Sequence, residues 1–317
     1  MKKILSAIAL AIIVISVASI AACKNDGGNV IEEATPTATV QTSTPTVTPY
    51  STTFIIPPAT QQYPSPIIID HNCTDISKIS PDWITQAKNI LGIAYGHTSH
   101  GSQITTGMSG LEGFAGELYA WNGDGSGSAL QLKDGGLGSA SDLGNPSFTA
   151  WESTTRSYLD SHPSTNVVMW SWCGQVSGAS SDDIDTYLGL MSGLEDDYPS
   201  VHFVYMTGHT DGTGLEGNLH IRNQQIMDYC VANNKILYDF EDIESYDPDG
   251  NYFGDRYVTD SCDYDGGNWA VEWQNSHQEG VDWYQCSSAH SQPLNANLKA
   301  YAAWWLWTRL SGWSGNI

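Results

Sequence analysis

Four short apolar runs, rich in β-branched and aromatic residues, recur along the sequence at residues 90–96, 166–173, 201–208 and 235–242. Continuous runs of this kind are typical of strands that are buried on both faces. Helical patterns lie between and around them, at residues 81–89, 147–161, 182–198, 219–233 and 295–310. This alternation predicts a mostly parallel sheet with right-handed crossovers and helices on both faces, a three-layer α/β/α sandwich.

Polar residues follow each of these runs at the point where the predicted strand ends. The four segments are Gly96–Ser99, Trp172–Gln175, Gly208–Asp211 and Asp239–Asp242. Ligands of open parallel sheets bind outside the carboxyl ends of the strands. We therefore expect a functional site at this edge of the sheet.

Two long insertions, residues 106–145 and 245–288, interrupt the alternation. Loops of this length are uncommon unless they serve a site or a partner surface. The second insertion has acidic residues at calcium-loop spacing, but it lacks the terminal bidentate glutamate and the flanking helices. An ordinary acidic turn is therefore favoured there, and our main interpretation includes no bound metal. The positions with this spacing are Asp247, Asp249, Asn251 and Asp255.

The N-terminus has the features of an export signal. Lys2 and Lys3 precede a long apolar run, and residues 20–23 (IAAC) resemble a bacterial lipobox. Residues 1–22 are therefore predicted to be a lipoprotein signal peptide, with Cys23 as the lipidated residue that holds the protein to a membrane outside the cytoplasm. A transmembrane anchor and a signal peptide without lipidation are the alternatives.

Residues 23–66 are rich in Thr, Pro and Ser and lack the apolar content that a packed core needs, so we interpret them as a tether. At most, residues 54–58 (FIIPP) and 66–70 (PIIID) add a strand at the edge of the sheet. The remaining residues, 67–317, are predicted to form one domain. The net charge of −23, with 12 Lys and Arg residues, argues against nucleic acid and anionic membrane surfaces as partners.

Of the 6 cysteines, Cys23 is assigned to lipidation, which leaves Cys73, Cys173, Cys230, Cys262 and Cys286. Because their number is odd, at least one thiol stays unpaired in a compartment that allows disulfides. Cys262 and Cys286 bracket a loop-rich segment and are the best candidates for a disulfide. Cys173 and Cys230 fall at a predicted strand end and in a predicted helix, where a buried, inert thiol is the more common outcome.

The segment GIAYGHTSHGSQ, residues 92–103, passes from a predicted strand into histidines and hydroxyl residues. A hydroxyl nucleophile needs a base within hydrogen-bond reach and donors for the developing oxyanion. Ser99 is the candidate nucleophile, with His97 and His100 beside it. Gly174 can give a backbone donor because a missing side chain permits close approach. His209, Thr210 and Asp211 are candidates for a further donor or for orienting the substrate.

His290 lies in a short loop before the last predicted helix, where periodicity does not require a histidine. With Ser99, Gly174 and the block at residues 207–211 (TGHTD), it gives the chain a pattern that resembles the SGNH (GDSL-like) hydrolase superfamily over residues 90–310. The resemblance implies a flavodoxin-like architecture, no cofactor, and ester hydrolysis with Ser99 as nucleophile and His290 as base.

The pattern of this superfamily is modified at three places. Gly-Asp-Ser is replaced by residues 96–99 (GHTS), so that Thr98 competes with Ser99 for the role of nucleophile. The usual asparagine of the third block is missing, and Thr210 or Asp211 stands near its place. Ser287 stands where the superfamily has an aspartate, three residues before the histidine. A Ser-His dyad, or an acid from elsewhere such as Asp282, must then serve His290.

Two other classes of function remain open. A metal-dependent hydrolase is one alternative, with ligands from His97, His100, His209, Asp211 and His290. A non-catalytic lipoprotein that binds polysaccharide through loop aromatics is the other. The aromatics in question are Trp121, Trp269, Trp273, Trp283 and Tyr284. Combined with a serine hydrolase core, they favour a carbohydrate ester, such as an acetylated polysaccharide, as the substrate, with a small ester as the other option.

Overall fold

The computed structural model describes residues 63–315. The predicted signal peptide, the lipidation residue Cys23, most of the predicted tether and the possible strand at residues 54–58 lie outside the described residues. Within residues 63–315, no helix combines the length and the apolar character that crossing a membrane requires.

The centre of the domain is a seven-stranded sheet in the order β1-β7-β6-β5-β2-β4-β3, and every pair in it is parallel. Its strands are β1 (Ile67–Ile69), β2 (Gly92–Gly96), β3 (Trp121–Asn122), β4 (Leu130–Asp134), β5 (Val167–Trp170), β6 (His202–Met206) and β7 (Ile236–Tyr238). The four apolar runs form β2, β5, β6 and β7 as predicted, and residues 66–70 supply the edge strand β1.

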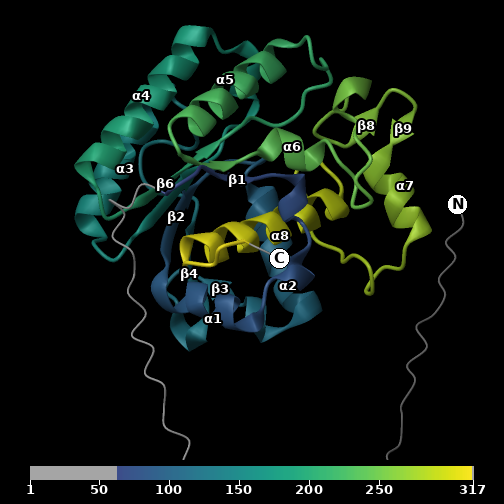
Figure 1. Ribbon diagram of the computed structural model, residues 1–317, viewed down its shortest axis with the longest axis horizontal. Helices are drawn as coiled ribbons and strands as arrows, with labels where there is room; N and C mark the ends of the chain where they lie inside the picture. The colour runs from purple at the N-terminus through teal and green to yellow at the C-terminus, as the bar shows by residue number, and fades with distance from the viewer. Residues whose placement is uncertain (1–62, 316–317) are drawn as a thin grey trace, which may run out of the picture. The chain divides into compact units, whose positions relative to one another are not determined.

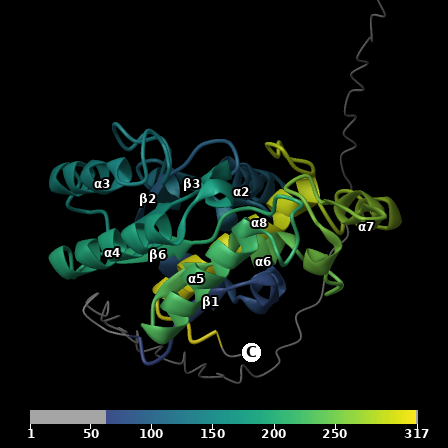
Figure 2. The same cartoon turned by 90° about the horizontal axis from the view of Figure 1, so that it is seen from above.

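Helices cover both faces of this sheet, which confirms the predicted three-layer α/β/α sandwich (Figures 1 and 2). One core cluster joins one face of the sheet to α1, α2 and α8, and a second joins the other face to α3, α4 and α5. The helices of the described residues are α1 (Pro81–Ile90), α2 (Ser102–Ala115), α3 (Ala150–Ser161), α4 (Ser181–Asp197), α5 (Asn218–Ala232), α6 (Phe240–Glu244), α7 (Trp269–Ser276) and α8 (Pro293–Leu310).

Local chemistry explains where several of these helices begin. The side chain of Ser180 accepts the N–H of Asp183, and the Asp183 carboxylate accepts the N–H of Ser180, which closes a capping box at the start of α4. Helix α8 begins at Pro293, two residues before the predicted start, because proline suits the first helical turn.

The prediction that residues 106–145 form a long insertion is wrong over much of that range. Residues 106–115 belong to α2, and β3 and β4 extend the sheet within the same stretch. Glycines at 107, 110 and 113 weaken the helical pattern, but Gly107 has a packing role. A Cβ there would lie 2.1 Å from the carbonyl oxygen of Ala296, so the glycine lets α2 approach α8 closely.

The second insertion contains α7 and a short hairpin of β8 (Asp263–Tyr264) and β9 (Gly267–Asn268). The exposed aromatic platform that the polysaccharide-binding alternative requires is not found at three of its positions, where a core role is the commoner one. Trp269, Trp283 and Tyr284 are only 1%, 6% and 4% exposed, because they fill the core beneath this segment. Trp121 and Trp273 are partly buried against the same core.

The expected disulfide between Cys262 and Cys286 is also wrong, since both are free thiols. The Cys262 sulfur lies 3.4 Å from the Ser291 hydroxyl oxygen, and the Cys286 thiol donates to the Pro293 carbonyl oxygen at 3.7 Å. Each sulfur therefore has its own polar neighbour rather than the other sulfur.

Candidate active site

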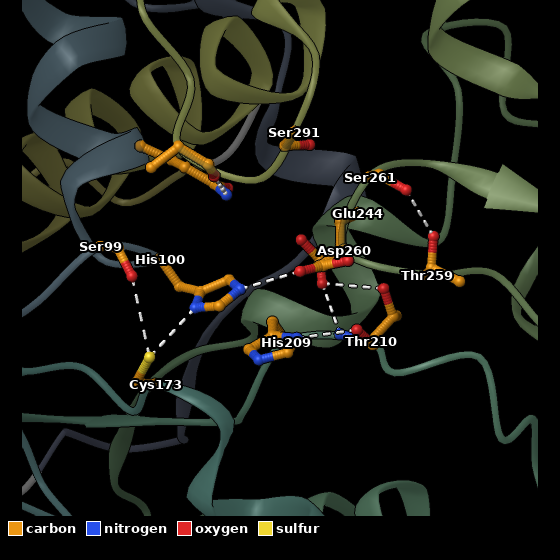
Figure 3. A network of polar contacts seen from close by, with 12 residues as sticks. Ser99, His100, Cys173, His209, Thr210, Glu244, Thr259, Asp260, Ser261 and Ser291 are labelled. Carbon is orange, nitrogen blue, oxygen red and sulfur yellow. Dashed lines mark hydrogen bonds and ion pairs between the residues drawn. The ribbon is translucent and has the colours of Figure 1, made fainter.

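The loops that follow β2, β5 and β6 meet at the carboxyl edge of the sheet, where these strands are neighbours. Ser99 and His100 come from the first loop, Cys173 from the second and His209 from the third. Figure 3 shows these four side chains close together, with Asp260 of the second insertion completing the group.

The turn that presents Ser99 and His100 depends on Gly101, the residue before α2. A Cβ at this position would lie 2.3 Å from the Ser171 hydroxyl oxygen and 2.7 Å from the Tyr95 phenol oxygen. The Tyr95 hydroxyl in turn donates to the Gly101 carbonyl oxygen at 3.0 Å. Because there is no room for a side chain at position 101, the turn depends on glycine there.

His100 is the centre of the site, because both of its ring nitrogens have a partner (Figure 3). Nδ1 lies 3.3 Å from the sulfur of Cys173, and Nε2 lies 2.9 Å from Oδ2 of Asp260. An ionised carboxylate can only accept a hydrogen bond, so we assign the ring proton to Nε2. Nδ1 is then free to accept a proton from the thiol. The three residues form a nucleophile, base and carboxylate in series.

The surroundings of His100 favour its neutral form. The residue is 7% exposed, and its ring stacks between His209, at a centroid distance of 3.8 Å, and His290, at 4.5 Å. Burial lowers the pKa of His100, although the hydrogen bond with Asp260 acts in the opposite direction. Burial also acts against ionisation of Asp260, but the hydrogen bond from His100 outweighs it, and the pKa of Asp260 is lowered. A neutral imidazole oriented by an ionised carboxylate suits a general base.

The two residues predicted as nucleophile and base, Ser99 and His290, lie on either side of this centre. The Ser99 hydroxyl oxygen is 3.8 Å from the Cys173 sulfur. His290 is exposed and has a positive φ of 63°. Among the described residues, no hydrogen bond joins Ser99 to His290, and the imidazole next to a nucleophilic atom is that of His100.

His209 contributes a buried atom without a partner. Its Nδ1 lies 2.7 Å from the carbonyl oxygen of Thr210, which assigns the ring proton to Nδ1. Its Nε2 is buried and has no hydrogen-bond partner in the described part of the chain. A Cβ on Gly174 would lie 3.8 Å from this Nε2 and meet no other atom within 4 Å. Nε2 of His209 is thus a buried acceptor close to the position that a side chain on Gly174 would take.

Thr210 connects the loop of His209 to a buried ion pair. Its N–H and hydroxyl both donate to Oε1 of Glu244, at 2.5 and 2.9 Å. Oε2 of Glu244 lies 2.5 Å from Nζ of Lys299, and both side chains are fully buried. Lys299 also donates to Oε1 of Gln103, whose amide nitrogen donates to the Ala289 carbonyl oxygen at 2.5 Å. The loops of His209 and His290 are therefore attached to one buried ion pair.

Two of the predicted acidic residues close turns. The Asp211 carboxylate accepts hydrogen bonds from the Ser177 hydroxyl at 2.7 Å and from the N–H of Thr213 at 3.0 Å. The Asp282 carboxylate accepts the N–H of Gln278 at 2.8 Å. The structure brings neither carboxylate to His290, and the carboxylate at the centre of the site is that of Asp260.

His97 lies at the edge of the site and pairs with a different carboxylate. Its Nε2 is 2.5 Å from Oδ1 of Asp134, and its Nδ1 is 2.9 Å from the Thr98 carbonyl oxygen. Burial acts to raise the pKa of Asp134, but the hydrogen bond from His97 outweighs it, and that pKa is lowered. His97 thus fixes the start of the loop through Asp134.

A chain of hydrogen bonds holds the loop after β2 against the loop after β5. The Thr98 hydroxyl donates to Oδ2 of Asp142 at 2.7 Å, and the Gln175 amide donates to Oδ1 of Asp142 at 3.1 Å. Oε1 of Gln175 accepts the N–H of Cys173 at 2.8 Å. The hydroxyl of Thr98 is therefore engaged in positioning Cys173.

Two groups of side chains in the described residues could hold a metal ion. In each group the candidate ligand atoms lie within 4.8 Å of one another. The first consists of His100, His209 and Asp260, so it shares two members with the ligand set predicted from the sequence. The second consists of Asp70, His71 and Asp242.

Sequence reasoning missed two residues of the central series, Cys173 and Asp260. Cys173 was expected to be an inert thiol, although it directly precedes Gly174 at a strand end. Asp260 lies in the second insertion, and the only signal for it was the length of that insertion.

Comparison of the chain with protein-family models finds no match, and comparison with curated proteins finds none either. The relation to the SGNH hydrolases stays a prediction from the motifs.

Proposed function

We propose that the protein is an extracytoplasmic, lipid-anchored hydrolase of carboxylic esters that acts by nucleophilic acyl transfer. One observation carries the proposal: His100 lies within hydrogen-bond reach of the Cys173 thiol on one side and of the Asp260 carboxylate on the other. A nucleophile, a base and a group that orients the base are the components that acyl transfer requires.

In the proposed reaction, Nδ1 of His100 takes the proton of the nucleophile and returns it to the leaving alcohol. Asp260 keeps the other ring proton on Nε2 and stabilises the imidazolium that forms. The N–H of Gly174 is the proposed donor to the oxyanion. General acid–base help of this kind contributes about 10²- to 10⁴-fold to the rate.

A carbohydrate ester, such as an acetylated polysaccharide, is the proposed substrate. Nε2 of His209 supports this choice, because a buried acceptor without a partner suits a hydroxyl group of a sugar or the hydrolytic water. The predicted lipid anchor would place the site where such polymers occur. Burial of Trp269 and Trp283 removes support for a mainly aromatic sugar platform.

The test is hydrolysis of a short-chain aryl ester and release of acetate from an acetylated glycan by the mature chain. H100A should reduce both rates by at least about 10²-fold. His162, which is exposed and stacks on Tyr158 at 4.0 Å, provides a matched control, and H162A should keep both rates. Wild-type rates in H100A would overturn the proposal.

A metal-dependent hydrolase is the second candidate, favoured by the unpartnered Nε2 of His209 beside His100 and Asp260. Metal analysis of the purified protein and the response of ester hydrolysis to a chelator distinguish the two. Loss of activity with the chelator and recovery with a divalent cation would favour the metal.

A further inference from the structure

We infer that the attacking atom is the sulfur of Cys173, so that the acyl intermediate is a thioester. The inference rests on the proposed function and deepens it, since it changes the nucleophile from the serine that the sequence predicts to a cysteine. Three observations carry it: the contacts of His100, the position of Cys173, and the contrast with the other thiols.

The base of the site reaches the sulfur and not the serine oxygen. Nδ1 of His100 lies 3.3 Å from the Cys173 sulfur, and Nε2 is occupied by Asp260 at 2.9 Å. Ser99 therefore finds neither ring nitrogen available. Its hydroxyl oxygen instead lies 3.8 Å from the same sulfur. The sulfur of Cys173 is therefore in contact with both the imidazole and the hydroxyl (Figure 3).

Cys173 is also held in place and left open on one side. Its N–H donates to Gln175, which is tied through Asp142 to the loop of His100. The thiol is half-buried, and Gly174 after it is exposed. A Cβ on Gly174 would meet only the buried, unpartnered Nε2 of His209, at 3.8 Å, so the residue after the sulfur is exposed and has a polar atom without a partner near it.

The other four thiols in the described residues lack this setting. No histidine nitrogen contacts any of them, and burial raises the pKa of each one. Cys286 is half-buried like Cys173 and bonds only to Pro293 and Asn297. It is therefore a matched control for a thiol outside the site.

The reaction can be written with every proton assigned. The Cys173 thiol gives its proton to Nδ1 of His100 as the sulfur bonds to the ester carbonyl carbon. The carbon–oxygen bond to the alcohol then breaks, and the alcohol takes that proton. Water next gives a proton to Nδ1 and bonds to the thioester carbon. The carbon–sulfur bond breaks, the sulfur regains its proton from His100, and the carboxylic acid leaves.

Ser99 has a supporting role in this scheme. Its hydroxyl can donate a hydrogen bond to the thiolate, which stabilises the negative charge on sulfur before attack. Removing the hydroxyl should therefore weaken the reaction without abolishing it.

The experiment compares C173A, S99A and C286A with wild type in hydrolysis of a short-chain aryl ester by the mature chain. C173A should lower kcat/KM by at least about 10³-fold, and S99A by about 10-fold. C286A should keep the wild-type rate. Full activity in C173A with loss in S99A would overturn the inference and leave the proposed function standing. Full activity in C173A, S99A and H100A would overturn both.

Mapping of the acyl adduct keeps the test independent of whether C173A folds. Wild-type protein is quenched in acid during turnover of the aryl ester, digested and analysed by mass spectrometry. The acyl group should be found on the peptide that contains Cys173 and should be released by hydroxylamine, as a thioester is. An adduct on the peptide that contains Ser99 would contradict the inference.

Discussion

Among the histidine–carboxylate pairs of the described residues, those of His100 and His71 have contrasting surroundings. His100 bonds to Asp260 through Nε2 and meets a thiol at Nδ1. His71 bonds to Asp242 at 2.6 Å through Nδ1, its N–H donates to the same oxygen, and its ring stacks on Tyr246 at 3.5 Å. In the described residues no thiol contacts the His71 ring. A histidine–carboxylate pair thus suits catalysis only where the other ring nitrogen faces a nucleophile.

The pKa shifts of the two carboxyl groups differ in direction. Burial is overcome at Asp260, whose pKa is lowered, because His100 donates a hydrogen bond to its carboxylate. At Asp242 burial prevails over the hydrogen bonds from His71, and the pKa is raised. The hydrogen bond from His100 thus favours the ionised form of Asp260, as an orienting group requires, whereas burial disfavours the ionised form of Asp242.

The largest difference between the two pairs is expected when each carboxylate is replaced by an amide. D260N should lower kcat for a short-chain aryl ester by about 10²- to 10⁴-fold, because an amide does not keep the proton on Nε2 of His100. D242N should leave kcat unchanged. Steady-state kinetics of both variants measure this, and equal losses would show that the two pairs do not differ in function.

The next largest effect is expected at the buried ion pair of Lys299 and Glu244. K299A should lower the free energy of unfolding by about 3–5 kcal/mol, because it leaves Glu244 charged and buried without its partner. Lys235, which pairs with Glu195 in a partly exposed setting, is the control. K235A should cost about 1 kcal/mol in urea unfolding. Similar costs for the two variants would contradict the structural role of the Lys299 pair.

A pH effect is expected beside the second pair. Burial, with the charges of Asp242 and Glu241, raises the pKa of Asp239 to about 8. The folded state then keeps a proton that the unfolded chain releases near pH 4, so stability falls as pH rises from about 5 to 8. The loss should be about 2–4 kcal/mol over that interval. Urea unfolding at both pH values should show a smaller decline in D239N, and an unchanged decline would refute this assignment.

The smallest effect is expected at His71. H71F keeps an aromatic ring against Tyr246 but removes the hydrogen bond from Nδ1 to Asp242. It should cost about 1–2 kcal/mol of stability in thermal unfolding and leave ester hydrolysis unchanged. H100F keeps a ring in the other pair but should abolish hydrolysis. Loss of hydrolysis in H71F would remove the distinction between the pairs.

The sequence predicted the fold well because the signals for it are local. Each of the four apolar runs became a strand, and the five helical patterns became helices. Helix α2 was missed because its glycines serve contact with α8, which is not visible in a linear pattern. The second insertion was expected to be a long loop, although it contains α7 and the hairpin of β8 and β9, and Trp269 and Trp283 belong to the core.

The site was predictable only up to the edge on which it lies. The strand-end rule brought Ser99, Gly174 and His209 to one place. It could not decide between His100 and His290 as the imidazole beside the nucleophile, because that depends on how the loops close. Asp260 comes from a loop without periodicity, and the role of Cys173 depends on a contact with a residue 73 positions away. These are tertiary features that no short pattern encodes.

The buried ammonium group of Lys299 has a consequence for how this protein can change. It holds, through Glu244 and Gln103, the two segments that carry His209 and His290. Redesign or evolutionary drift in either segment therefore disturbs the other, and the two must be altered together. The segment of Asp260 is joined to that of His209 as well, because the N–H of Gly212 donates to the Val258 carbonyl oxygen at 3.0 Å, so it too is expected to vary only in step with its neighbours.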